Sequence, residues 1–541
     1  CPFYVHGAVQ KVLGLRAEQV IVRQSATGGA FGGKEDYPSI LGCYAALLAW
    51  KSAHPVKIIY DRSEDILCTP KRHPSESRYK MGLTKEGKIT ALDVEMFLDS
   101  GAYTTLSRVV LQRTHLHVAG AYYVPNVRIH SRAMATNTPP TGAFRGFGAP
   151  QAIFAMERQM DLAAKKLAMN PLDIRLLNVL KTGDTFPYGQ KFTEAENARA
   201  VLEHAAEMSD YRAKYDLYAR QPKSRVMKGI GIAVGLHGGG FTGAGEDKMG
   251  TTAKMTFDGE IFRIYSSSTE MGQGASTVMP MVAAEALGTE LEDVLYIVPD
   301  TSKTPNTGPT VASRTTMYAA KAVQNACTNL KKTVLDWAET KGLKAASFKE
   351  LAADYLKEHQ ELEALGTNIF NDGCSWDEEN FTGDAYRGYA WIANTAEVEV
   401  ETDTYEVTVK ESAIAAEVGR AVNPMQARAQ LTGGVLQGFG WAHIEDLRID
   451  DKGRYTASHM SSYLVPSALD CPDWKVELLE DPCEAGCYGA KGIGELPANA
   501  GAPAFIAAVE NAVGVSADSI PLTGEKLFTL LEAAKSAQGE N

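Results

Sequence analysis

Three features are scarce in this sequence: cysteine, basic charge and long apolar runs. Eight cysteines are spread over 541 residues, which is too sparse for the disulfide scaffold of a small secreted protein. Acidic residues outnumber basic ones by 66 to 54, for a net charge of -12, so a nucleic-acid partner held by phosphate contacts is not expected. The apolar runs all end well short of the roughly 20 residues that a membrane helix needs. The composition therefore indicates a globular protein in a reducing, cytoplasmic setting, with no nucleic-acid partner and no membrane insertion.

The sequence also lacks an initiator methionine and a signal-peptide pattern. It opens on Cys1-Pro2-Phe3 and runs directly into an apolar, helix-like stretch, without the charged and apolar regions that mark a leader. We expect a further segment before it, either in a longer precursor or on a companion subunit.

The length exceeds what one hydrophobic core usually supports, so at least two domains are expected. A polar stretch at residues 212–227, which includes Gln221-Pro222-Lys223-Ser224, is the candidate linker. We place one domain at residues 1–222 and a second at residues 223–541.

Strand and helix patterns are mixed along the chain rather than segregated, which favours an α+β fold. Strand patterns occur at residues 19–23, 56–60, 89–98, 252–257, 261–266 and 398–409. Helix patterns occur at residues 38–50, 153–167, 171–180, 276–287, 423–440 and 503–513. Residues 341–363 are charged and helical in character, and we interpret them as a surface excursion.

Five segments concentrate glycine together with a few functional side chains. They are Gly28-Gly-Ala-Phe-Gly-Gly-Lys-Glu35, Gly142-Ala-Phe-Arg-Gly-Phe-Gly148, Glu270-Met-Gly-Gln-Gly274, Gly308-Pro-Thr-Val-Ala-Ser313 and Lys491-Gly-Ile-Gly-Glu495. Such loops bring backbone N–H groups close to an anionic ligand. Each loop alone is more often a simple turn, and none matches a complete dinucleotide or Walker fingerprint. Together they predict a large phosphate-bearing ligand held from several directions.

In this order and with these separations, the five loops resemble those of the xanthine dehydrogenase and aldehyde oxidase family of molybdenum hydroxylases, most of all the purine (xanthine) dehydrogenases. The resemblance runs from Cys1 almost to the end of the chain. It implies an α+β fold with two mixed α/β domains of the molybdenum-binding type and the cofactor between them.

The resemblance makes Glu495 the catalytic base. Its carboxylate would take a proton from the oxygen that attacks an electron-poor sp2 carbon. The alternative for a lone glutamate at this position is a helix cap or a solvated loop residue. Family members hold molybdenum, with its oxo and sulfido ligands, through the pterin dithiolene and not through protein side chains. No Cys/His cluster in this sequence suggests otherwise, and Cys483 and Cys487 are interpreted as two free thiols.

Contacts to this molybdopterin cofactor are implied for residues of four loops and for one glutamine beyond them. They are Phe31, Gly32, Arg145, Gln273, Ala312, Ser313 and Gln437. Backbone and amide groups suit pterin edges and phosphates. Whether the pterin carries a cytosine dinucleotide or a single phosphate stays open.

Two polar residues favour a purine or related N-heterocycle such as xanthine or hypoxanthine. The resemblance places Glu35 and Arg113 against the substrate, where Arg113 would stabilise negative charge that develops on the ring. Phe147 would stack on the flat substrate. Phe241 is the candidate for a second aromatic contact, although residues 235–241 depart from the pattern of the animal enzymes.

Other functions stay open at this point. Aldehydes and nicotinate-like heterocycles are alternative substrates, and a non-catalytic scaffold subunit is an alternative of a different class. A carbon monoxide dehydrogenase is disfavoured, because those relatives carry a cysteine-bearing loop where this chain has Phe144-Arg145-Gly146-Phe147.

The family's iron–sulfur and flavin modules do not fit in this sequence, so electrons are expected to pass to [2Fe-2S] and FAD groups on partner subunits. The first part of the molybdenum domain, with a glutamine that lies near the metal in relatives, would precede Cys1. A further polypeptide is therefore expected to supply it.

Overall fold

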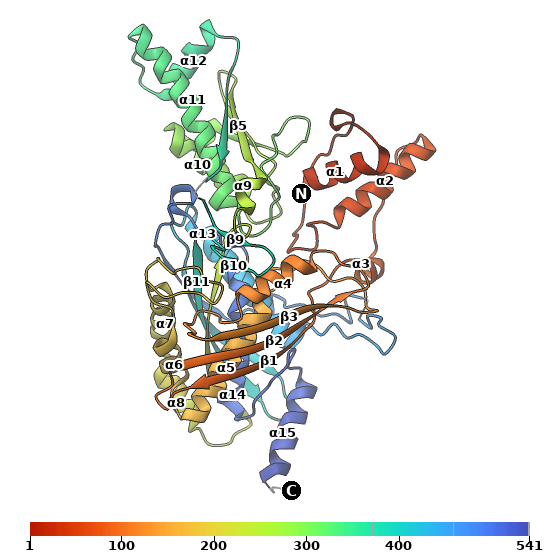
Figure 1. The fold of residues 1–541 in the computed structure, drawn as a ribbon, viewed down its shortest axis with the longest axis vertical. Coiled ribbons are helices and arrows are strands. Elements are labelled where there is room, and N and C mark those ends of the chain that lie inside the picture. Colours follow the sequence, from red (N-terminus) through yellow and green to blue (C-terminus); the bar gives the residue numbers. More distant parts are fainter. Residues whose placement is uncertain (371–372, 458, 539–541) are drawn as a thin grey trace.

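The computed structural model describes residues 1–370, 373–457 and 459–538 (Figure 1). Its central sheet has the strand order β13-β12-β11-β4, formed by β4 (Val226–Gly238), β11 (Tyr389–Glu401), β12 (Val407–Glu417) and β13 (Asp473–Leu479). The β4–β11 and β11–β12 pairs are antiparallel, and β12–β13 is parallel. The structure confirms the α+β class.

Helices cover both faces of this sheet. On one face α14 (Gly501–Val513) lies so close to β4 that a Cβ at Gly231 would be 2.2 Å from the Ala504 carbonyl oxygen. Glycine is required there because the two backbones touch. On the other face α7 (Asn197–Met208) and α8 (Tyr211–Ala219) share a core with alternate β4 residues such as Ile230 and Ile232. The sheet is thus buried on both sides.

A second sheet, of order β1-β2-β3, crosses the lower half of the molecule in Figure 1. Its strands are β1 (Ser75–Leu83), β2 (Ile89–Gly101) and β3 (Val127–Ala135), and its helices are α4 (Ser107–Leu116), α5 (Ala149–Leu167) and α6 (Pro171–Asn178). Its apolar residues belong to the same core as α7 and β4, which ties the N-terminal third of the chain to the central sheet.

A third sheet, of order β7-β6-β5-β8, forms the upper part of the molecule. It contains β5 (Thr251–Phe257), β6 (Phe262–Tyr265), β7 (Val294–Ile297) and β8 (Leu362–Asn368), packed with α10 (Ala275–Leu287), α11 (Ala320–Lys341) and α12 (Phe348–Glu358). The predicted helix end at Gly288 is present, with φ 72 in the left-handed region.

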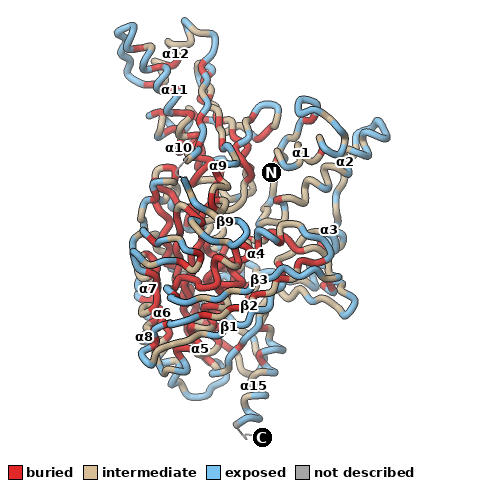
Figure 2. The backbone as a smooth tube through the Cα atoms, in the orientation of Figure 1, coloured by how far each residue is buried: buried red, intermediate tan, exposed pale blue. Residues whose placement is uncertain are grey.

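The first helices form an arm beside this body. We define the arm as α1 (Pro2–Leu13), α2 (Pro38–Ser52) and the chain between them, and the two helices pack mainly against each other. Although α2 is apolar on all sides, none of its residues is buried. Figure 2 shows the arm mostly in the colours of exposed and half-buried residues, in contrast to the buried centre of the body.

The remaining named elements are shorter or peripheral. They are α3 (Arg62–Cys68), α9 (Gly245–Met249), β9 (Trp376–Asp377), β10 (Thr382–Gly383), α13 (Pro424–Phe439), α15 (Gly524–Gln538) and several one-turn 3-10 or π segments. The helix α13 begins as its sequence indicates, because the Asn423 side chain accepts from the Gln426 N–H and proline follows at the first helical position.

Two strand predictions are wrong, and a third joins two separate strands. Residues 19–23 begin at the end of a 3-10 turn (Ala17–Gln19) and have one isolated bridge, from Arg23 to Asp300. Residues 56–60 are extended without a pairing partner in the described chain. The pattern at 398–409 spans the end of β11, a turn and the start of β12, because alternation continues across a tight hairpin.

The first half of the candidate linker at 212–227 is helix, since α8 continues as far as Ala219. The division at residue 222 stays a prediction. In the described part of the chain no helix is both long and apolar enough to cross a membrane.

Candidate active site

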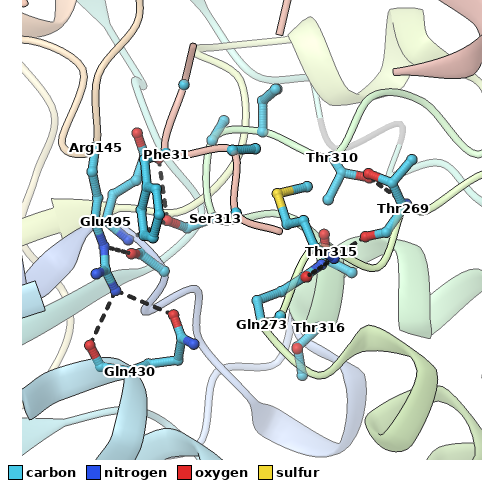
Figure 3. Close-up of a pocket in the computed structure, with 18 of the residues that line it drawn as sticks. Phe31, Arg145, Thr269, Gln273, Thr310, Ser313, Thr315, Thr316, Gln430 and Glu495 are labelled. Carbon is cyan, nitrogen blue, oxygen red and sulfur yellow. Dashed lines mark hydrogen bonds between the residues drawn. The ribbon is translucent and has the colours of Figure 1, made fainter. Parts of the chain in front are cut away.

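All five glycine loops line one cavity of about 930 Å³. The arm contributes the first glycine loop and the residues next to it, and α13 forms one further wall of the cavity. Figure 3 shows Arg145, Gln430 and Glu495 together on one side, and Gln273 with the hydroxyl residues Thr269, Thr310, Thr315 and Thr316 on the other. The loops that the sequence marks as separate features therefore form a single site.

Close backbone contacts hold the loops in pairs. A Cβ at Gly32 would lie 2.5 Å from the Ala143 carbonyl oxygen, and a Cβ at Gly492 would lie 2.2 Å from the Ser313 carbonyl oxygen. The first loop thus touches the second, and the fourth touches the fifth. Any side chain at these two glycines would push the loops apart.

The cavity is lined by backbone N–H groups that lack partners. Phe31, Ala312 and Ser313 have φ between 50 and 53, and Gly32 has φ 108. These left-handed values interrupt helix and strand geometry, so the N–H groups here are not aimed at the backbone acceptors of a regular element. Within the described residues, the N–H groups of these four positions donate to no acceptor. Unpaired N–H groups at a cavity wall are donors for an anionic or heteroaromatic ligand.

Arg145 connects three parts of the wall. Its Nε donates to the Gly494 carbonyl oxygen at 2.6 Å, its Nη1 to Gln437 Oε1 at 3.1 Å, and its Nη2 to both Oε1 and the carbonyl oxygen of Gln430. The residue is buried, and burial lowers the pKa of its guanidinium to about 10, so it is charged at neutral pH. Arg145 therefore positions the residue before Glu495 instead of forming a surface ion pair.

The Glu495 side chain is 13% exposed. Its Oε2 lies 3.2 Å from both Ser313 Oγ and His237 Nε2, while its backbone N–H donates to Ser313 Oγ at 3.0 Å. Burial alone would raise the pKa of Glu495, but His237, Arg113 and Ser313 outweigh it and hold the pKa below its ordinary value. The carboxylate is ionised at neutral pH and lines the cavity.

Arg113 lies behind this carboxylate. Its Nη1 contacts His237 Nε2 at 2.7 Å and the Gly238 carbonyl oxygen at 3.0 Å, and its Nη2 donates to the Gly240 carbonyl oxygen. Among the described residues that line the cavity, neither Arg113 nor Phe241 is present. The guanidinium bonds to the end of β4 and to the chain just after it, and the Phe241 N–H donates to Glu246 Oε1. Direct substrate contacts for both stay predictions.

Glu35 and Phe147 do line the cavity. Glu35 is 9% exposed, and burial, followed by the charges of Glu495 and Asp36, raises its pKa to about 8. At neutral pH this carboxyl carries its proton. It can donate a hydrogen bond where Glu495 can only accept.

The third loop is held by its own side chains. Gln273 Oε1 accepts from the Met271 N–H, and its Nε2 donates to the Thr269 carbonyl oxygen. The Glu270 carboxylate accepts from the N–H groups of Gly272, Gly274 and Ser276, so it occupies the N-terminus of α10. The predicted cofactor contact of Gln273 stays a prediction.

Two residues of the site were missed by sequence reasoning. Gln430 lies seven positions before Gln437 on α13, so the two share a helix face, and this spacing is a signal that could have indicated it. His237 is on β4, and no local pattern distinguishes it from a structural histidine.

Protein ligands for a metal are not apparent in the described residues, which contain no group of three or more His, Cys, Asp or Glu able to hold an ion. Cys483 and Cys487 are both free thiols.

Comparisons with known proteins agree with this site. Two family models, each described as a molybdopterin cofactor-binding domain, match residues 1–179 and 204–472. A probable xanthine dehydrogenase subunit of Bacillus subtilis (strain 168) is 31% identical over 96% of this chain and 70% of its own length. The xanthine dehydrogenase of Dictyostelium discoideum is 32% identical over 94% of this chain and 37% of its own. The aldehyde oxidoreductase from Desulfovibrio gigas has a TM-score of 0.87 at 27% identity, over 97% of this chain and 56% of its own.

The fold and the cavity are thus those of a molybdopterin cofactor-binding protein. The chain belongs to the xanthine dehydrogenase family of molybdenum oxidoreductases. It spans 70% of the Bacillus relative, about half of the Desulfovibrio chain and little more than a third of the Dictyostelium enzyme.

Proposed function

We propose that the chain is the molybdenum-cofactor subunit of a hydroxylase that inserts water-derived oxygen into a C–H bond of a purine or related N-heterocycle. The observation that carries this proposal is Glu495, an ionised and largely buried carboxylate at the wall of a cavity lined by unpaired N–H groups.

The lining residues fit a molybdopterin. The N–H groups of Phe31, Gly32, Ala312 and Ser313 would hold pterin edges and phosphates. The hydroxyl side of the cavity, with Thr310 and Thr316, offers further donors. The volume of about 930 Å³ accommodates a pterin with either a single phosphate or a dinucleotide, so both forms stay open.

When bound, the cofactor supplies the oxidising centre that accepts two electrons from the substrate. The reaction adds one water oxygen to the carbon and releases two protons with the two electrons. Glu495 accepts a proton from the attacking oxygen, for which an ionised carboxylate is required. Arg145 keeps the Gly494–Glu495 backbone in place during this transfer, and the protein around Glu495 limits access of bulk water.

Glu35 and Phe147 would orient the heterocycle. The protonated Glu35 carboxyl can donate to a ring nitrogen or carbonyl oxygen, and Phe147 offers a flat apolar surface for stacking. A purine presents both kinds of group. An aldehyde needs neither, although the structural likeness to the Desulfovibrio aldehyde oxidoreductase keeps an aldehyde substrate as the second candidate.

Electrons would leave to [2Fe-2S] and FAD groups on partner subunits. This is supported by the Bacillus relative, which is itself named as one subunit of a xanthine dehydrogenase, and by the shares of the relatives' lengths that the chain spans. A polypeptide carrying the first part of the molybdenum domain is a further proposed partner, and the uncovered apolar surface of α2 supports it.

The proposal is tested on the purified complex by assays with xanthine, hypoxanthine, nicotinate and aldehydes, together with molybdenum and pterin analysis. Purine turnover that is lost in Glu495→Gln, with the cofactor retained, is expected. Turnover of aldehydes alone would contradict the purine assignment. A complex without molybdenum and pterin would instead support a scaffold role.

A further inference from the structure

The strand residue His237 lies directly behind the carboxylate of Glu495. It is 0% exposed, and it pairs with Ala390 in the β4–β11 ladder. Its Nε2 is 3.2 Å from Glu495 Oε2 and 2.7 Å from Arg113 Nη1. His237 also lies in the 235–241 segment, where the sequence departs from the pattern of the animal enzymes.

We propose that His237 is a positioning residue that holds the Glu495 carboxylate by donating a hydrogen bond from Nε2. This inference rests on the proposed role of Glu495 and adds a residue that acts through it.

The geometry makes the link specific. An imidazole Nε2 has either one proton or one lone pair in the ring plane, so it can donate to Glu495 or accept from Arg113, but not both. Nδ1 of His237 is buried and has no hydrogen-bond partner among the described residues. The polar contacts of this ring are therefore concentrated on the one atom that faces both the carboxylate and the guanidinium.

Arg113 acts on Glu495 by its charge and by fixing the backbone that carries His237. Its other hydrogen bonds are to the carbonyl oxygens of Gly238 and Gly240, which fix the chain immediately after His237. The guanidinium also lies 5.0 Å from the ring centroid of Tyr386. Because Arg113 fixes the backbone beside His237, it helps to keep the imidazole next to the carboxylate.

Other charged and titratable groups act on Glu495 from neighbouring elements. They are Glu35 in the first loop, Arg145 in the second, Arg72 before β1, and His117 after α4. Only His237 and Ser313 make side-chain hydrogen bonds to the Glu495 carboxylate among the described residues. Loss of the bond from His237 leaves a buried carboxylate with one side-chain partner, so its pKa should rise.

A pair of polar variants tests the link. In His237→Gln the side-chain amide nitrogen reaches the position of Nε2, whereas in His237→Asn it stops near the position of Nδ1. We expect the acid limb of kcat/KM in the purified holo-complex to move up by about one pH unit or more in His237→Asn, and by less than half of that in His237→Gln. We expect kcat at the parent optimum to fall about 10-fold to 100-fold in His237→Asn.

A second readout does not depend on turnover. The infrared band of the protonated Glu495 carboxyl, isolated as the difference from Glu495→Gln, should titrate at higher pH in His237→Asn than in the parent. His237→Leu should behave like His237→Asn, because neither side chain can donate to the Glu495 carboxylate. His443→Gln is the control, since this half-buried histidine stacks on Phe505 and does not line the cavity.

The outcomes separate the two claims. If the acid limb and the carboxyl band stay at the parent pH in folded His237→Asn, the inference is wrong. An equal shift in His443→Gln would also overturn it. If Glu495→Gln keeps full turnover, the proposed function fails, yet the infrared titration still reports whether His237 controls the Glu495 carboxyl.

Discussion

The two ends of the cavity wall are built in different ways. Around Glu495, side chains from β4 and the fourth loop bond to its carboxylate, and Arg145 of the second loop bonds to the carbonyl oxygen of the preceding residue. Around the first loop, Phe31 is 53% exposed, and the helix that follows has no buried residue although its sequence is apolar. The first wall is organised by side chains of this chain, whereas the second exposes apolar surface of the kind that forms a protein core or an interface.

Two apolar helices make the same contrast. The helix α14 buries nine of its residues against β4, β11 and their neighbours, whereas α2, of similar apolar character, buries none. Composition is alike in both, so the difference comes from what each helix packs on. We therefore expect substitutions in the wall around Glu495 to change catalysis or folding, and substitutions in the exposed arm to change assembly.

The largest effect is expected at Glu495. Glu495→Gln keeps the shape and removes the base, so kcat should fall by about 10²-fold to 10⁴-fold. Steady-state kinetics with cofactor analysis would check this. The surface residue Glu363, on β8, provides the control Glu363→Gln, which should leave turnover unchanged. Equal activity in both variants would show that the organised wall is not catalytic.

Arg145→Lys should have the next largest effect. Lysine keeps the charge but cannot make the bonds to Gly494, Gln437 and Gln430 at once, so the wall loosens around Glu495. We expect molybdenum content to fall and kcat/KM to decrease by roughly 10-fold to 100-fold. Arg78→Lys, on the exposed face of β1, is the matched control. Full cofactor content with parental kinetics would refute a positioning role for Arg145.

Glu35→Gln should change the pH dependence of stability. Because burial raises the pKa of Glu35 to about 8, above its unfolded value, its protonated form favours folding at low pH, and this contribution is lost as pH rises toward 8. Removing the ionisable group should raise Tm relative to the parent at pH 9 and leave it nearly unchanged at pH 4. Calorimetry at both values measures this, and an equal shift at both would contradict the burial of this carboxyl.

The smallest effect on folding is expected in the arm. Leu48 is 51% exposed on α2, so Leu48→Glu should change the stability of the chain by no more than about 0.5 kcal/mol. It should instead reduce the amount of partner polypeptide that co-purifies. Ile506→Glu in α14, at a fully buried position, is expected to prevent folding. If Leu48→Glu leaves the amount of co-purified partner unchanged, the exposed face of α2 does not bind a partner, and the contrast between the two walls does not hold.

Much of the fold was predictable where local chemistry decides it. The helices at α10 and α13 have their glycine end and asparagine cap in the sequence, and the strand at β2 shows its alternation. The prediction at residues 19–23 failed because a short apolar stretch does not reveal whether a partner strand is available. The five glycine loops indicated a binding site when they were considered together. Gln430 could have been found only from its position on the same face of α13 as Gln437.

The sequence by itself determined the family, the five glycine loops and the carboxylate at the end of the last one, because these depend on residue types at particular positions. Tertiary structure decided which side chains meet. It placed His237 between Glu495 and Arg113, committed Arg113 to backbone carbonyls after β4 instead of the cavity wall, and left α2 without cover. The first two outcomes depend on contacts between residues more than 100 positions apart in the chain. The third depends on what packs around α2. No local sequence pattern encodes either of them.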